Sequence, residues 1–221
     1  MRTRPLAVLF DLDGTLIDSA PDLAGTCNAM RLDRGLDALP YEQLRRAVGT
    51  GARGMVWASF GLAPGDAGYD DLRDEFLDRY EARMTRETQI FADVVPVLAW
   101  LGSERLTWGI VTNKATRLAA PLTQHLGLMD HAATLVCGDT VAHSKPHPAP
   151  LLEAARRLGL DSSGCIYVGD DRRDVDAGRA AGMGTVVACW GYLGDGERPA
   201  AWGADHLIES PGDLIALIGG A

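Results

Sequence analysis

Lysine is almost absent from this chain, since only two of its 21 basic residues, Lys114 and Lys145, are lysines. Positive charge is outnumbered as well, because 30 acidic residues leave a formal net charge of −9. An acidic protein repels the phosphates of nucleic acids and of anionic membranes, so neither is expected as a partner. Any anionic ligand must therefore find its positive charge in a local group of side chains.

Long apolar runs and paired cysteines are missing too. No apolar stretch approaches the ~18 residues that a membrane-spanning helix needs. The first residues, MRTRPLAVLF, place two arginines before an apolar run as a signal peptide does, but the run stops at Asp11 and no small-residue cleavage site follows. The four cysteines are widely spaced without a CxxC pair, which favours reduced core residues over disulfides or a metal centre. We therefore expect a cytoplasmic protein.

Short apolar runs bounded by Gly, Asp or Asn are typical of strands buried on both faces of a parallel sheet. Five such runs occupy residues 6–10, 106–112, 134–138, 165–169 and 185–189. Helical patterns lie between or after them at 93–103, 115–127, 148–159 and 172–182, and a weaker strand at 206–209 and a helix at 212–219 complete the series. This alternation predicts an α/β fold with a doubly wound parallel sheet.

Residues 17–88 interrupt the alternation and contain no convincing strand. Amphipathic helical patterns occur there around 20–34, 41–48, 52–60 and 69–87, separated by turn signals. We therefore expect an α/β catalytic core of residues 1–16 and 89–221 with an inserted all-helical cap domain of residues 17–88. A cap in this position would cover the carboxyl edge of the sheet, where α/β folds bind ligands.

The densest signal is the segment LAVLFDLDGTLIDS, residues 6–19. Asp11 and Asp13 follow a predicted buried strand directly, and the two-residue period of an extended chain points both side chains the same way. Two carboxylates aimed at one point repel each other unless a cation lies between them or one is protonated. Mg²⁺, a hard cation that takes oxygen ligands and readily shares a phosphate, suits such a site.

This segment resembles motif one of the haloacid dehalogenase-like (HAD) superfamily, and three later segments resemble the other motifs in order. GIVTN, residues 109–113, ends a predicted strand with Thr112, as motif two does. HSKPHPAP, residues 143–150, places Lys145 as in motif three, and YVGDDRRDVDAGRAAG, residues 167–182, resembles the GDxxxD pattern of motif four. The resemblance covers essentially the entire chain and implies a HAD-like Rossmannoid core.

The resemblance implies an enzyme that hydrolyses phosphoric monoesters. Asp11 would be the nucleophile that forms an aspartyl-phosphate, and Asp13 the general acid and base. Lys145 and the Thr112 hydroxyl would bind the equatorial phosphoryl oxygens in the transition state. Together with a metal cation, Lys145 would supply the local positive charge that the acidic composition requires.

The family pattern also implies a magnesium site. Its ligands would be the Asp11 carboxylate, the Asp13 backbone carbonyl and the Asp170 carboxylate, while Asp174 would orient the groups around the metal, Lys145 included. For Asp171, a role at the site and a role as a helix-capping or solvated acid are both open.

Three further residues have two interpretations each. Asn113, directly after Thr112, either donates to the phosphate or caps the strand. Arg53, in the cap segment GTGARGMV, is either an exposed helix arginine or a fork-shaped cation that binds a substrate carboxylate, and we favour the second. His147 lies beside Lys145 in a KPHP turn, which is more typical of the start of a helix than of a catalytic base.

Other classes within the superfamily are tested by particular residues. Dehalogenases lack the second catalytic aspartate, which is present here as Asp13. Phosphonatases with this cap type use a cap lysine, and no lysine precedes Lys114. P-type ATPases need membrane spans, and no apolar stretch of this sequence is long enough for one. A sugar-phosphate mutase stays open because motifs alone do not identify the phosphoryl acceptor. The alternative that is not an enzyme is a non-catalytic HAD-fold binding protein.

Cap type and length resemble the phosphoglycolate phosphatase group. Within it, GTGARGMV, WGIVTNKATRLAAPL, VGDDRRD and WGADHLIESP look closer to bacterial N-acetylmuramic acid 6-phosphate phosphatases of peptidoglycan recycling. The expected substrate is therefore a small carboxylated phosphate ester, first N-acetylmuramic acid 6-phosphate and alternatively phosphoglycolate. Arg53 would suit the carboxylate of either. A monomer and a homodimer are both compatible with the sequence.

Overall fold

The computed structural model describes residues 4–194 and 196–220, which divide into two compact units. The sheet unit contains the residues up to 17 and from 90 onward, and the helical unit contains residues 18–89. The chain passes between them twice, at two short strands, β2 (Ile17–Asp18) and β3 (Gln89–Ile90), which pair in a two-stranded sheet. The sequence predicted no strand within residues 17–88, and this prediction is wrong at residues 17–18. A strand of two residues is too short to show an alternating hydrophobic pattern in the sequence.

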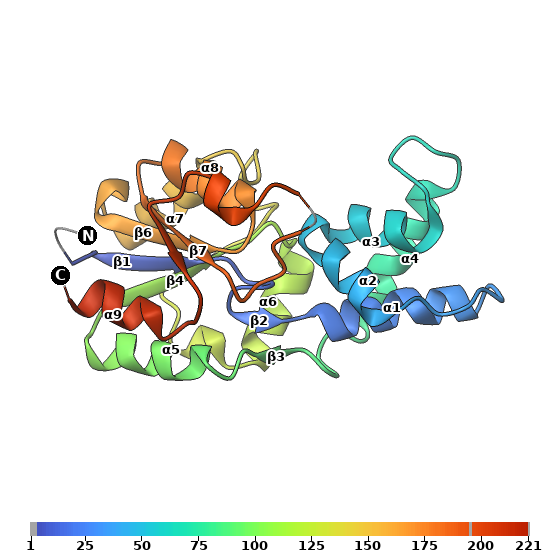
Figure 1. Ribbon diagram of the computed structural model, residues 1–221, viewed down its shortest axis with the longest axis horizontal. Helices are drawn as coiled ribbons and strands as arrows, with labels where there is room; N and C mark the ends of the chain where they lie inside the picture. The colour runs from blue at the N-terminus through green and yellow to red at the C-terminus, as the bar shows by residue number, and fades with distance from the viewer. Residues whose placement is uncertain (1–3, 195, 221) are drawn as a thin grey trace. The chain divides into compact units, whose positions relative to one another are not determined.

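The sheet unit is built on a parallel sheet with the order β5-β4-β1-β6-β7-β8 (Figure 1). Its strands are β1 (Ala7–Phe10), β4 (Thr107–Val111), β5 (Leu135–Val136), β6 (Cys165–Gly169), β7 (Gly184–Ala188) and β8 (His206–Ile208). The predicted fold class is confirmed. β1 lies in the middle of the sheet between β4 and β6, so its carboxyl end is at the place where the winding of an α/β sheet reverses and ligands bind.

Helices cover both faces of this sheet, α7 (Ala149–Leu158) and α8 (Arg172–Ala180) on one and α5 (Val94–Ser103) and α9 (Asp213–Gly219) on the other (Figure 1). Helix α6 (Thr116–His125) connects β4 to the edge strand β5. Short 3₁₀ turns are η2 (Leu128–Asp130), η3 (Ser162–Gly164) and η4 (Pro199–Ala201). Small and aliphatic side chains of β1, β6, α7 and α8 form one continuous apolar core, which fixes the strand ends in place.

The helical unit consists of α1 (Ala20–Leu32), α2 (Tyr41–Ala47), η1 (Val48–Thr50), α3 (Gly51–Phe60) and α4 (Tyr69–Glu81). Its own core includes Met30, Leu44, Met55, Phe76 and Tyr80, each at most 1% exposed. Helix α4 ends at Glu81, six residues before the predicted limit of 87. The backbone beyond it is engaged elsewhere, since the amides of Glu87 and Thr88 donate to the Asp22 carboxylate.

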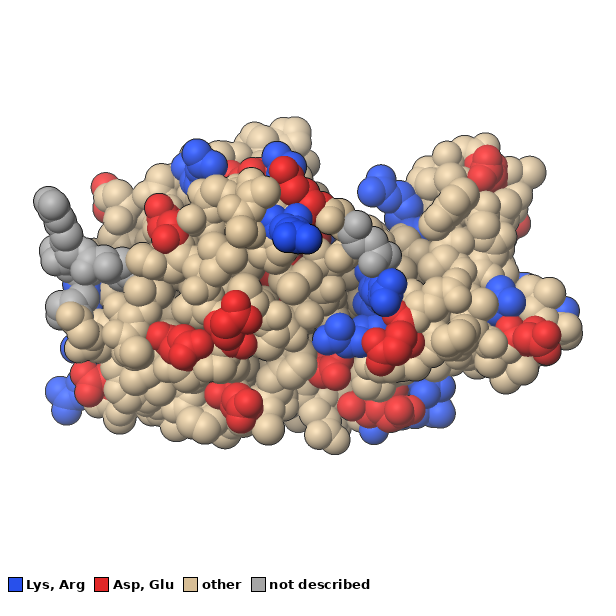
Figure 2. Space-filling model, in the orientation of Figure 1, with Lys and Arg blue, Asp and Glu red and all other residues tan. Residues whose placement is uncertain are grey.

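Charged side chains of both signs are interspersed over the face drawn in Figure 2. Among the residues that the structure describes, no helix has the length and apolar character needed to cross a membrane.

Candidate active site

Asp11 and Asp13 follow β1 directly, where the sequence pattern places the end of a buried strand. The Asp11 amide donates to the Val168 carbonyl at 2.8 Å and so continues the pairing of β1 with β6. Gly14 then turns the chain with a φ of +84°. A Cβ atom at this position would lie 2.2 Å from an Asp170 carboxylate oxygen and 2.8 Å from the Tyr192 ring, so only glycine fits there.

Lys145 brings positive charge to the carboxyl end of β1. Its Nζ lies 2.9 Å from Asp11 Oδ1 and 2.7 Å from Asp174 Oδ1, and it also donates to the Tyr167 hydroxyl at 2.7 Å and the Val111 carbonyl at 3.1 Å. Burial on its own would lower the pKa of this lysine, but the charges of Asp11 and Asp174 outweigh it and raise the pKa. Lys145 is therefore a fully charged, buried ammonium group.

Three carboxylates meet at the same point. Asp11, Asp170 and Asp174 each offer an oxygen atom, and these atoms lie within 4.8 Å of one another. Thr15 Oγ1 donates to Asp170 Oδ1 at 2.9 Å, and the Tyr192 amide donates to Asp170 Oδ2 at 2.8 Å, which holds this side chain in one orientation.

The electrostatics of this cluster call for more positive charge than Lys145 supplies. Burial, followed by the charges of Asp11 and Asp174, raises the pKa of Asp170 well above its usual range. Burial likewise raises the pKa of Asp11 from 3.8 to about 6, although Lys145 opposes the shift. Two buried acids and the half-buried Asp11 beside one lysine are stabilised by a further cation, and an all-oxygen donor set suits a hard divalent ion. The cluster therefore fits a divalent metal.

Asp13 has a cationic neighbour that the sequence argument missed. Lys114 Nζ lies 2.8 Å from Asp13 Oδ1, and only 8% of the Lys114 side chain and 21% of the Asp13 side chain are exposed. The available signal was the scarcity of lysine: Lys114 is one of two in the chain and follows Thr112 by two residues. Both lysines thus serve the same group of aspartates.

Thr112 and Asn113 order the two loops that carry these lysines, Lys114 after β4 and Lys145 after β5. The Thr112 hydroxyl is buried and accepts a hydrogen bond from the Lys114 amide at 3.1 Å. The Asn113 amide group pairs with the Lys145 backbone in both directions, donating to its carbonyl and accepting from its amide at 2.9 Å each. The structure gives Asn113 a positioning contact, and phosphate binding by Asn113 stays a prediction.

Asp171 and Asp174 together begin α8. Asp171 is the N-cap, accepting from the Arg173 amide at 2.8 Å, while Asp174 Oδ2 accepts from the Asp171 amide at 3.1 Å, so the two acids form a capping box. The Arg173 guanidinium also donates to both Asp171 carboxylate oxygens. Burial on its own would raise the pKa of the Asp171 carboxyl, but the hydrogen bond and charge of Arg173 outweigh it and lower the pKa. Of the two roles left open for Asp171, helix capping is the one observed.

Two other predicted residues lie outside this group. His147 is at the start of α7, where its Nδ1 accepts from the Ala149 amide at 3.1 Å, which supports the helix-start interpretation. Arg53 lies exposed on the first turn of α3 in the helical unit. Carboxylate binding by Arg53 stays a prediction.

The arrangement of a strand-end aspartate pair, a buried lysine and two further acids on one sheet edge agrees with a family match. The model of the haloacid dehalogenase-like hydrolase family matches residues 8–188. The chain belongs to this family. The match runs from β1 to the end of β7, so it includes all the acids and both lysines of the site.

Individual HAD-like relatives are similar over nearly the whole length. The chain is 49% identical over 211 residues to a phosphoglycolate phosphatase from Xanthomonas campestris pv. campestris, with 95% of each chain covered. It is 42% identical to an N-acetylmuramic acid 6-phosphate phosphatase from Pseudomonas putida, covering 100% of this chain and 98% of that one. A crystal structure of a predicted phosphoglycolate phosphatase from Haemophilus somnus shares the fold, with a TM-score of 0.85 at 24% identity over 98% and 99% of the two chains.

These findings confirm the expected class, a phosphatase of the HAD type that acts on phosphoric monoesters. The two curated relatives carry names with different substrates, so similarity leaves open which ester this HAD phosphatase takes.

Proposed function

We propose that this protein is a Mg²⁺-dependent phosphomonoesterase that hydrolyses a small carboxylated phosphate ester through a phosphorylated Asp11. The observation that carries the proposal is the placement of Asp11 between the buried ammonium of Lys145 and the Asp170 and Asp174 carboxylates. A carboxylate can approach a phosphate dianion only where positive charge offsets the repulsion, and Lys145 together with a divalent cation held by these acids would supply that charge.

The two aspartates divide the chemistry. Asp11 attacks phosphorus, the bond between phosphorus and the ester oxygen breaks, and the leaving alkoxide takes a proton from Asp13. Asp13 then removes a proton from a water molecule, which attacks the aspartyl-phosphate and releases inorganic phosphate and free Asp11. Lys114, at 2.8 Å from Asp13, orients the carboxyl group that moves the proton.

Lys145 and the Thr112 hydroxyl bind the phosphoryl oxygens during transfer, and Asn113 and Tyr167 hold Lys145 in place. The Asp11 and Asp170 carboxylates and the Asp13 backbone carbonyl would hold Mg²⁺. When bound, the ion neutralises the charge of the transferring phosphoryl group and favours the ionised form of Asp11. Asp174 orients Lys145 through its 2.7 Å ion pair.

The direct test is hydrolysis of p-nitrophenyl phosphate with and without Mg²⁺. We expect turnover that needs the ion, is abolished by EDTA and returns with added Mg²⁺, while Asp11→Asn has no turnover under any of these conditions. Turnover by the wild-type protein no greater than that of Asp11→Asn would leave a HAD-fold binding protein as the better description.

For the substrate we propose N-acetylmuramic acid 6-phosphate, with phosphoglycolate as the alternative. The supporting observations are the segments GTGARGMV and WGADHLIESP and the similarity to the Pseudomonas putida relative. The greater identity to the Xanthomonas relative supports the alternative. Values of kcat/KM for the two esters, measured side by side, decide between them. A cytoplasmic location and a monomeric or homodimeric state stay predictions.

Both candidate substrates carry a carboxylate, and we propose that Arg53 of the helical unit, acting as a cap, binds it. We predict that Arg53→Ala raises KM for the preferred ester about tenfold or more, because a charge-assisted pair is lost, and leaves KM for p-nitrophenyl phosphate nearly unchanged. Arg73→Ala, at a half-buried arginine on α4 of the same unit that pairs with Asp70 and Asp74, is the control for loss of an arginine from this unit. Equal effects of Arg53→Ala on both substrates would remove Arg53 from the specificity site.

A further inference from the structure

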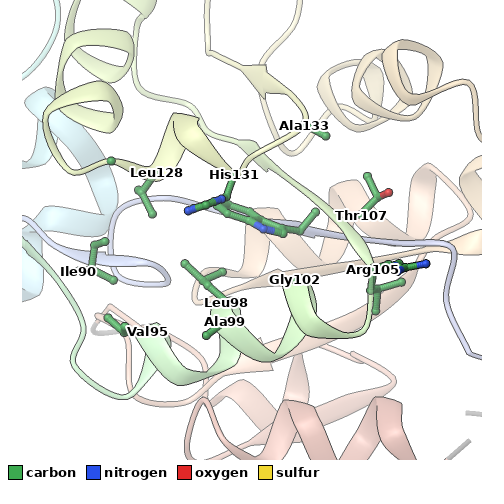
Figure 3. A pocket seen from close by; sticks show the side chains of 13 residues that line it. Ile90, Val95, Leu98, Ala99, Gly102, Arg105, Thr107, Leu128, His131 and Ala133 are labelled. Atoms are coloured by element: carbon green, nitrogen blue, oxygen red, sulfur yellow. The ribbon is translucent and has the colours of Figure 1, made fainter.

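A cavity lies in the sheet unit, at the opposite end of β4 from the aspartates. Its volume is about 560 Å³, and it is bounded by α5, by the first residues of β4 and by the segment around η2 (Figure 3). Trp108 and Leu128 form buried parts of its wall. Helix α5 contributes a stripe at the helical spacing of three and four residues: Val95, Leu98, Ala99 and Gly102.

Helix α5 has an unusual composition for a surface helix. Its sequence VVPVLAWLGS is apolar at every position before the final serine. Val94, Val97 and Leu101 are buried against the protein, yet the neighbouring stripe that lines the cavity, which a surface helix normally fills with polar residues, is apolar as well. Val95 is 51% exposed. The cavity therefore offers an apolar surface to a bound molecule.

One end of the cavity is cationic. Arg105 lines it and adopts a φ of +53° just after α5. The Leu106 amide donates to the Leu101 carbonyl at 2.9 Å and the Arg105 amide donates to the Gly102 carbonyl at 3.1 Å, a pattern in which the second residue past the last helical one is normally glycine. An arginine here carries backbone strain that a glycine would avoid.

No side-chain contact compensates for the backbone strain at Arg105 among the described residues. Within residues 4–194 and 196–220, no hydrogen bond or ion pair is made by its guanidinium. The neighbouring acid, Glu104, is paired with Arg4 at 2.9 Å and so does not neutralise it. His131, which faces the α5 stripe in Figure 3, likewise has no side-chain partner in that part of the chain.

We propose that this cavity binds a small amphipathic anion, a molecule with an apolar body and one acidic group. The apolar body would lie along the α5 stripe against Trp108, and Arg105 would bind the acidic group. The volume is within the range of roughly 300–1,000 Å³ typical of small-molecule sites, and such sites combine an apolar lining with a few convergent polar groups. This site is separate from the phosphatase chemistry and does not depend on it.

Two dyes with the same aromatic rings test the proposal. The anionic probe 8-anilinonaphthalene-1-sulfonate carries a sulfonate, and N-phenyl-1-naphthylamine lacks it. We expect the full-length protein to bind the anionic dye about tenfold more tightly than the neutral one, because only the sulfonate pairs with Arg105. Fluorescence titration measures both. Saturating inorganic phosphate should displace neither dye, and displacement would show that the dyes bind at the catalytic aspartates instead.

Arg105→Gly separates binding from folding. Glycine suits the positive φ, so the thermal midpoint should not fall, while binding of the anionic dye should weaken about tenfold and binding of the neutral dye should hardly change.

Ala99→Trp fills the cavity and should weaken the binding of both dyes, with turnover of p-nitrophenyl phosphate confirming that the variant is folded. Arg156→Ala, an exposed arginine on α7, is the control for loss of charge. Unchanged binding of the anionic dye to Arg105→Gly, or of both dyes to Ala99→Trp, would overturn the proposal.

Discussion

Each of the two lysines is paired with one of the two aspartates that follow β1. Lys145 lies 2.9 Å from Asp11 and Lys114 lies 2.8 Å from Asp13. The two pairs differ in exposure. Lys145 is 4% exposed and lies against two acids, whereas 21% of the Asp13 side chain that pairs with Lys114 is exposed. A buried ammonium suits a fixed electrostatic role, and a partly open carboxyl suits an exchange of protons with substrate and water.

Substitution of Lys114 tests its link to Asp13. Asp13 is needed most when the leaving group is a poor one, since p-nitrophenolate departs without protonation. We therefore predict that Lys114→Met lowers kcat/KM for an alkyl phosphate about tenfold to a hundredfold, a fraction of what general acid catalysis contributes, and affects p-nitrophenyl phosphate much less. Lys114→Arg, which keeps the charge, should restore part of the loss. Equal losses on both esters would mean that Lys114 acts on the phosphoryl group rather than through Asp13.

The raised pKa of Asp11 predicts a pH dependence of stability in the metal-free protein. Burial raises this pKa from 3.8 in the unfolded chain to about 6 in the folded one. Between these values the folded state holds a proton that the unfolded state has released, so the contribution of Asp11 to stability is present below about pH 4 and is lost as the pH rises towards about 6.

Asp11→Asn lacks this titration. We predict that the free energy of unfolding of Asp11→Asn increases relative to the wild type as the pH rises from about 4 to about 6 in EDTA. Denaturant titrations at several pH values measure the difference. Added Mg²⁺ favours the carboxylate and should reduce it. A difference that shrinks with rising pH in EDTA would contradict the assigned shift.

At the scale of elements, the sequence predicted the strands and the acids at their ends, and it did so for a physical reason. Continuous apolar runs specify buried parallel strands, and the carboxyl ends of such strands share one edge. Asp11, Asp13 and Asp170 could be placed on that edge from their positions directly after β1 and β6.

The supporting contacts could not be predicted, because they join residues far apart in the chain. Tyr167 was part of an apolar run, and its hydroxyl contact with Lys145 depends on the packing of α7 and β6. Thr15 donates to Asp170 across 155 positions, and no local period contains that information. Lys114 belongs to the same class, since only the fold brings it to Asp13.

The first turn of helix α8 depends on its capping residue, Asp171. Asp171 caps its first turn and pairs with Arg173, so Asp171→Ala should lower the free energy of unfolding by about 1 kcal/mol, the usual effect of losing an N-cap. Asp171→Ser retains a capping oxygen and should stay within about 0.5 kcal/mol of the wild type. Urea denaturation measures both. A serine variant as unstable as the alanine variant would show that the Arg173 ion pair, rather than the cap, stabilises α8.

At the scale of the whole molecule, the chain passes from one unit to the other at residues 17–18 and again at residues 89–90. Inside the helical unit, Asp22 near the start of α1 ties down the segment that leads out of the unit. Its Oδ2 accepts from the Glu87 amide, the Thr88 amide and the Thr88 hydroxyl at 2.8–2.9 Å, and its Oδ1 lies 3.2 Å from Arg83 Nε. Entry and exit of the chain are therefore fixed to each other within one unit.

Removing Asp22 should destabilise the helical unit selectively. Asp22 is completely buried, so Asp22→Ala leaves three donors without their acceptor, while Arg83 keeps its ion pair with Glu87, and a loss of about 2–4 kcal/mol is expected. Hydrogen exchange read by mass spectrometry should show faster exchange across residues 18–89, most of all at Glu87 and Thr88, with β1 and β6 still protected. Asp33→Ala, which breaks an exposed pair with Arg79 in the same unit, should change exchange little. Equal loss of protection in β1 and β6 would mean that the two units unfold together, and the two crossings would then transmit stability between them.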